Sequence, residues 1–240
     1  MSDSTLRIHL LSGPRNISTA MMYSFAQRSD TRVVDEPLYA HYLRVTGIAH
    51  PGREETLASQ ENDGQKVVEQ ELLGDWDRPV VFFKHIAKHV TALDRDFLLQ
   101  GKVLFLIREP DQMLTSWIKQ MPNPTLQETA LQDQWELAQW LESKGQQPLV
   151  VDSKTILQDP KSQLTKLCNA LGIPFDEHML HWKAGARPED GVWAPYWYDA
   201  VHQSTGFAPY KRKEAQVPER LHALLQESNN YYELLNRYAL

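Results

Sequence analysis

Short apolar runs that alternate with helical patterns restrict the fold of this sequence more than any other feature. Residues 80–83 (Val-Val-Phe-Phe) and 103–107 (Val-Leu-Phe-Leu-Ile) contain no polar residue. Such continuous runs are typical of strands that are covered on both faces, as in a parallel sheet. Further candidate strands lie at residues 6–11, 32–34 and 149–151.

Helical patterns separate these candidate strands. Residues 126–141 and 161–171 carry apolar side chains at helical spacing, and Gly172 suits the end of the second helix. The alternation predicts an α/β fold of three layers, with helices on both sides of a mainly parallel sheet of about five strands. Ligands of such folds bind beyond the carboxyl ends of the strands, so functional residues are expected there.

The composition excludes several classes of protein. The 240 residues include 25 Lys and Arg against 31 Asp and Glu, a net charge of −6, which argues against a general nucleic-acid or membrane-surface binder. Cys168 is the single cysteine, so neither an intramolecular disulfide nor a cysteine-rich zinc site is expected. No apolar run approaches a membrane span of roughly 20 residues, and the N-terminus lacks signal-peptide features. We expect a cytoplasmic protein with one domain over residues 1–240.

Polar and basic residues connect the first candidate strand to the helix that follows it. They form the run Gly13-Pro14-Arg15-Asn16-Ile17-Ser18-Thr19. Free N–H groups at a helix start, the helix dipole and the Arg15 guanidinium together suit a phosphate or sulfate. The hydroxyls of Ser18 and Thr19 would add donors. The alternative is a well-capped turn with a surface arginine.

The fourth candidate strand carries Arg108 to the same edge of the sheet. Ser116 follows eight residues later, in the helix that Pro110 would open. A guanidinium and a hydroxyl group together suit a terminal phosphate. The alternative is an ordinary arginine paired with Glu109 or Asp111.

These two segments resemble the cofactor motifs of the P-loop sulfotransferases. Members of that family often carry Pro-Arg/Lys-Ser-Gly-Ser/Thr-Thr after the first strand, and this sequence matches at the proline, the arginine and the final Ser-Thr pair. It departs at Asn16 and Ile17, where Ser-Gly is more usual. Ile17 takes a positive φ only at a cost, so we expect a loop backbone different from that of relatives with glycine.

The family's second motif is an apolar strand, an arginine, a turn with proline, and a serine eight residues after the arginine. In the family this arginine and serine hold the 3′-phosphate of 3′-phosphoadenosine 5′-phosphosulfate (PAPS). The resemblance therefore implies a P-loop NTPase-like fold in which Arg108 and Ser116 bind PAPS. It also implies sulfuryl transfer to a hydroxyl or amine of a small-molecule acceptor, without a metal.

Sulfuryl transfer to an alcohol requires a positioned general base. Branches of the family use either a glutamate near the second strand or a histidine after the third, and Glu36 and His85 occupy these places here. We favour Glu36 as the base and expect Arg15 to stabilise the leaving phosphate. The alternatives are a charge at a helix start for Glu36 and a hydrogen-bonded strand-end histidine for His85.

Two further segments could close the site. The basic cluster Lys211-Arg212-Lys213 resembles the family's basic loop over the nucleotide, although surface decoration is the alternative. The aromatic residues at 191–199 would form either a lid or a packed surface flap. Tyr39, His41 and Tyr42 could line the acceptor site.

Two other functions remain open. A P-loop kinase-like phosphotransferase is disfavoured because Gly-Lys-Ser/Thr is absent and Arg108 stands where a magnesium-binding aspartate would follow a strand. A nucleotide-binding module without catalysis is the second alternative. Many enzymes of the resembled family pair, so a homodimer is considered as well, although no segment here is diagnostic of one.

Overall fold

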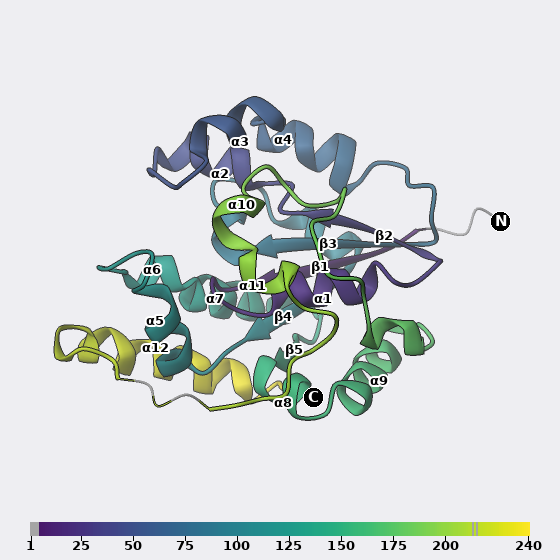
Figure 1. The fold of residues 1–240 in the computed structure, drawn as a ribbon. Helices are drawn as coiled ribbons and strands as arrows, with labels where there is room; N and C mark the ends of the chain where they lie inside the picture. The colour runs from purple at the N-terminus through teal and green to yellow at the C-terminus, as the bar shows by residue number, and fades with distance from the viewer. Residues whose placement is uncertain (1–4, 213, 215) are drawn as a thin grey trace.

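A computed structural model describes residues 5–212, 214 and 216–240 (Figure 1). Five parallel strands form one sheet in the order β2-β3-β1-β4-β5, which confirms the predicted α/β fold. The strands are β1 (Leu6–Ser12), β2 (Thr31–Asp35), β3 (Val80–Ile86), β4 (Lys102–Ile107) and β5 (Leu149–Asp152). In the register, Ser12 pairs with both Ile86 and Leu106, so the carboxyl ends of the three central strands lie level with one another.

Helices cover both faces of the sheet (Figure 1). They are α1 (Ser18–Phe25), α2 (Tyr39–Thr46), α3 (Arg53–Ser59), α4 (Gly64–Val67), α5 (Pro110–Trp117), α6 (Leu126–Thr129), α7 (Leu131–Ser143), α8 (Ser153–Gln158), α9 (Pro160–Leu171), α10 (Ala194–Trp197), α11 (Asp199–His202) and α12 (His222–Asn236). Within the described ranges, no helix combines the length and the apolarity needed to cross a membrane.

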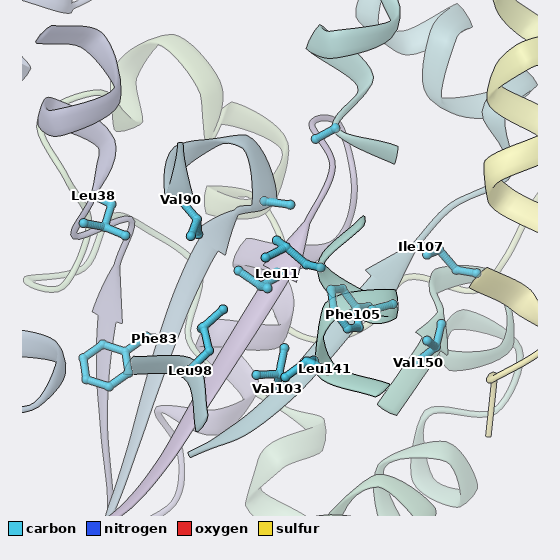
Figure 2. Close-up of a cluster of buried hydrophobic side chains, with 14 of the residues drawn as sticks. Leu11, Leu38, Phe83, Val90, Leu98, Val103, Phe105, Ile107, Leu141 and Val150 are labelled. Carbon is cyan, nitrogen blue, oxygen red and sulfur yellow. The ribbon is translucent and has the colours of Figure 1, made fainter. Parts of the chain in front are cut away.

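Each face of the sheet has its own apolar core. Leu11 packs with Phe105 and Leu141 on the face covered by α7 and α12, and Figure 2 shows this cluster. Leu10 packs with Met22 and residues of α9 on the opposite face. Because both faces are buried, an apolar side chain is favoured at every strand position, which explains the continuous apolar runs.

The segment predicted as one helix at 126–141 is two helices. Ala130 has a left-handed backbone, with φ of 59°, and separates α6 from α7. Thr129, at the end of α6, packs closely against Gly13. A Cβ added to Gly13 would lie 2.7 Å from the carbonyl oxygen of Thr129. Close packing of α6 against the loop after β1 therefore accompanies a break that the local sequence does not predict.

Candidate active site

A cavity of about 400 Å³ lies at the carboxyl edge of the sheet, within the size range of small-molecule sites. Residues after four strands line it, as do residues from the segment that runs from α10 to the basic cluster. They include Pro14, Arg15, Asn16, Ile17, Ser18, Thr19, Glu36, Lys84, Lys88, Arg108, Ser116, Trp193, Trp197, Tyr198 and Phe207. The structure thus brings most of the sequence-predicted site residues together around one cavity.

The loop after β1 has an unusual backbone at Arg15. Its φ is 53°, in the left-handed region, whereas Ile17 has φ of −90°. A left-handed residue other than glycine costs roughly 1–3 kcal/mol. Ile17 thus avoids the positive φ that would be costly for it, and Arg15 is the loop residue that adopts one. Asn16 fixes this conformation, since its Nδ2 donates to the Leu106 carbonyl (2.9 Å) and its Oδ1 accepts from the Ile17 N–H (2.9 Å).

The start of α1 is open to a ligand. The residue at the N-cap is Ile17, whose side chain makes no capping hydrogen bond, and the first N–H groups of a helix have no partner within it. Ser18 and Thr19 are buried and line the cavity with the loop before them. The well-capped turn considered as an alternative is therefore absent from this loop, and the free N–H groups and the helix dipole favour an anion.

Gly13 and Pro14 complete the loop. A Cβ on Gly13 would meet the Thr129 carbonyl, so glycine is required here by close approach of the chain rather than by its own φ. Pro14 lines the cavity beside Arg15.

The two basic motifs interlock. Arg108 Nη1 donates a short hydrogen bond to the backbone carbonyl of Arg15, and Arg15 Nε donates to Ser116 Oγ at 3.2 Å. Burial lowers the pKa of both arginines, and the charge of Arg15 lowers the pKa of Arg108 further. Among the described residues, neither guanidinium forms an ion pair. Two like charges held together without a counter-ion make a site for an anion.

The acids next to Arg108 are paired elsewhere. Arg212 reaches Glu109 at 2.7 Å and Asp111 at 2.6 Å, and the Tyr210 hydroxyl donates to Glu109 at 2.6 Å. The alternative pairing of Arg108 with these acids therefore does not form. These contacts join Tyr210 and Arg212 to the start of α5.

Lys211 and Arg212 of the basic cluster are not part of the cavity lining. Arg212 is bound to acids, Lys211 is exposed, and Lys213 lies outside the described residues. The wall at this place is instead formed by residues just before the cluster, such as Phe207.

Glu36 also lines the cavity, directly after β2, and belongs to a buried polar network. It is 7% exposed and, like Arg15, has a positive φ, here 43°. Lys84 Nζ donates to Glu36 Oε1 at 2.5 Å and to Asp35 Oδ1 at 2.8 Å. It also donates to the hydroxyl of Tyr198 at 2.6 Å. This network fixes the Oε1 atom of Glu36 and leaves Oε2 as the oxygen that Lys84 does not bind.

Burial makes Glu36 a stronger base than an ordinary carboxylate. Burial raises the pKa of Glu36, Lys84 opposes the rise, and Asp35 adds to it. Burial alone would lower the pKa of Lys84, but Asp35 and Glu36 outweigh it and hold that pKa well above its usual value. Lys84 therefore stays charged beside Glu36.

His85 lies away from the cavity. Lys84 and His85 are adjacent on β3, so their side chains point to opposite faces of the sheet. His85 is fully buried, and its Nε2 lies 3.3 Å from Nδ1 of His9. Burial lowers its pKa well below the usual value, and His9 and Lys84 add to this effect. The structure therefore places His85 in the core, and it is Lys84 that faces the candidate base.

The buried histidine pair predicts acid sensitivity. Burial lowers the pKa of His9 to about 3, and that of His85 also falls. The unfolded chain binds protons on both below about pH 6.5. The free energy of unfolding should therefore fall with pH from about 6.5 downwards, by up to about 1.4 kcal/mol per pH unit for each histidine.

Denaturant titrations between about pH 7 and pH 5 check this. We expect a shallower pH slope for the double variant His9→Leu/His85→Leu than for the wild type. Equal slopes would contradict the assignment of the pair as buried and neutral.

Aromatic side chains form the remaining wall. Tyr39 stacks on His89 (ring centroids 4.8 Å apart) and meets Trp193 edge-on (5.2 Å). Trp193 and Tyr198 are buried against α2, so the aromatic segment packs as a flap and also lines the cavity. His41 donates from Nε2 to the Thr91 carbonyl at 2.9 Å and is bound outside this wall.

Fold and site together define an α/β protein with two arginines beside an open helix start at the carboxyl edge of a parallel sheet, and with a buried carboxylate on the same cavity. The sequence profile described as "Sulfotransferase domain" matches residues 6–239. The chain belongs to this family of sulfotransferase domains.

Solved structures confirm the fold. The sulfotransferase domain from the curacin biosynthetic pathway superimposes with a TM-score of 0.59 at 16% identity, covering 95% of this chain and 98% of that one. A sulfotransferase from Alicyclobacillus acidocaldarius gives a TM-score of 0.53 at 14% identity, covering 97% of this chain and 96% of that one.

Two curated relatives are more similar in sequence. The chain is 42% identical over 232 residues to branched-chain-amino-acid aminotransferase-like protein 1 of Arabidopsis thaliana, and 39% identical over 229 residues to protein 2 of that name. The matches cover 96% and 95% of this chain but 42% and 41% of the relatives. The chain thus spans about two fifths of the length of these relatives.

Proposed function

We propose that this protein transfers a sulfuryl group from PAPS to a hydroxyl or amine of a small-molecule acceptor. The observation that carries the proposal is the pair of arginines at the open start of α1, Arg15 and Arg108, which have no ion-pair partner within the part of the chain that the structure describes. Membership of the sulfotransferase-domain family supports the same reaction.

The residues present suit this donor. Arg108 and Ser116 would hold the 3′-phosphate, and the loop N–H groups with Ser18 and Thr19 would hold the phosphosulfate. Bound PAPS supplies a sulfuryl group whose bond to the 5′-phosphate oxygen breaks as a bond to the acceptor forms. Arg15 would stabilise the negative charge left on that phosphate oxygen.

Glu36 is the base in this proposal. Its Oε2 would accept the proton of the acceptor hydroxyl, since Oε1 is held by Lys84. Lys84 acts as a positioning residue, because its contacts to Asp35 and Tyr198 fix the carboxylate that it binds. No other change of protonation is needed within the network.

Isothermal titration calorimetry with 3′-phosphoadenosine 5′-phosphate (PAP) tests the donor site. We expect PAP to bind without magnesium and more tightly than ATP or AMP, because the 3′-phosphate adds contacts to Arg108 and Ser116. Binding of ATP with magnesium, without binding of PAP, would favour the kinase-like alternative. Selective PAP binding with no turnover of labelled PAPS on any acceptor would favour a binding module.

A further inference from the structure

Lys88 is a buried ammonium group without a direct partner. It lies on the turn Ala87–Val90 that follows β3, is 4% exposed and lines the cavity. Among the described residues, its Nζ has neither a hydrogen bond nor an ion pair. The ring of Tyr42, with its centroid 5.1 Å away, is a neighbour of the charge. Burying a charge without a partner is costly, which marks this position for a ligand.

The acids around Lys88 do not neutralise it by contact. Burial lowers the pKa of Lys88, and Glu128, Asp133 and Glu36 act against this from a distance. Glu36 is bound by Lys84, and Glu128 forms a capping box with Thr125 at the start of α6. Lys88 thus faces the same cavity as the candidate base and has no acid in direct contact with its Nζ among the described residues.

The walls next to Lys88 suit a flat apolar body. Tyr39 and His89 are stacked with 4° between their ring planes, and the rings of Trp193 and Trp197 line the same cavity. His50 also lines it, and its buried Nε2 has no partner among the described residues, while its Nδ1 contacts the Tyr39 hydroxyl at 2.9 Å. In small-molecule sites, aromatic walls bury the body of the ligand and a few polar groups fix its orientation.

We propose that Lys88 binds a carboxylate of the acceptor, so that the acceptor is a small hydroxyl- or amine-bearing carboxylic acid with a flat apolar body. This inference rests on the sulfotransferase function proposed above. A single negative charge fits better than the two charges of a phosphomonoester, because one ammonium is available and the Glu36 carboxylate lies on the same cavity. The carboxylate would pair with Lys88 while the hydroxyl or amine is presented to Glu36.

Calorimetry with matched probes tests the proposal. The probes are 3-(hydroxymethyl)benzoate, the neutral benzyl alcohol, and 3-(hydroxymethyl)phenyl phosphate, each titrated into the full chain with and without saturating PAP. We expect the carboxylate to bind about tenfold to a hundredfold more tightly than the alcohol, as for hydrogen bonds to charged groups. Equal affinities would overturn the proposal, and tighter binding of the phosphate would replace the carboxylate with a phosphomonoester.

Variants assign the effect to Lys88. In Lys88→Met the preference for the carboxylate should disappear, PAP affinity should stay within about twofold, and thermal stability should not fall, because a buried charge is removed. Lys88→Gln repeats the test with a polar side chain, and Lys102→Met, at the opposite end of the sheet, is the control. A preference that survives in both Lys88 variants would overturn the proposal.

The two proposals fail differently. Loss of the donor function would appear as absence of PAP binding, whereas the carboxylate titration without PAP still reports on Lys88. Normal PAP binding with no carboxylate preference would refute the inference alone.

Discussion

Glu36→Gln is expected to lower the turnover of PAPS by about 10²–10⁴-fold, the range typical of a positioned general base. The amide keeps the shape of the side chain and can still accept from Lys84, but it cannot take the proton of an acceptor hydroxyl. Release of PAP from PAPS in the presence of an acceptor measures the effect. Since burial raises the pKa of Glu36, wild-type kcat/KM should also fall on the acid side at a pH above the usual carboxyl range.

The affinity for PAP separates catalysis from folding in this variant. PAP binding to Glu36→Gln should match that of the wild type, because Glu36 follows β2, which β3 and β1 separate from β4 and Arg108. Full turnover in Glu36→Gln would refute its role as base. Equal loss of turnover and of PAP binding would indicate a structural role instead.

Arg108→Ala is expected to weaken PAP binding by about a hundredfold. The substitution would remove the charged donor that we propose for the 3′-phosphate, worth roughly 1.5–3 kcal/mol, and it also removes the hydrogen bond to the Arg15 carbonyl. Calorimetry with PAP and with AMP separates the loss of the 3′-phosphate contact from the loss of the hydrogen bond to the Arg15 carbonyl. The loss should be larger for PAP than for AMP, which lacks the 3′-phosphate.

Arg212→Ala is the matched control for Arg108→Ala. Arg212 is paired with Glu109 and Asp111 outside the cavity lining, so its loss should change PAP affinity much less. If Arg108→Ala and Arg212→Ala weakened PAP binding to the same extent, the cause would be the loss of one positive charge rather than the loss of a specific contact. The assignment of Arg108 to the 3′-phosphate would then be wrong.

The sequence predicts the sheet and the end of α9 well because those signals are local. Continuous apolar runs require burial on both faces, and Gly172 takes the left-handed backbone, with φ of 79°, that ends the helix. The break at Ala130 escapes prediction because alanine is a good helix former. Its left-handed φ accompanies packing of α6 against Gly13, which is distant in sequence.

The site residues also divide into those that the sequence predicts and those that it does not. Arg15 and Arg108 follow strands whose carboxyl ends are level, so the sequence alone brings them to one edge. Lys84 is missed because its role depends on the register that pairs it with Asp35. A buried pair of acids such as Asp35 and Glu36, at the end of one strand, needs a cation from the neighbouring strand. The position of Lys84, next to His85 on the third strand, is the sequence signal that could have identified this cation.

The interlocked arginines also limit how this site could be engineered. Each loop supplies the group that orients the other, since the Arg15 carbonyl holds Arg108 and the hydroxyl of Ser116 holds Arg15. A graft of either loop onto another parallel-sheet scaffold would arrive with an unsupported guanidinium. The smallest transplantable unit is therefore both loops together with the adjacent pair of strands, β1 and β4, that sets the distance between them.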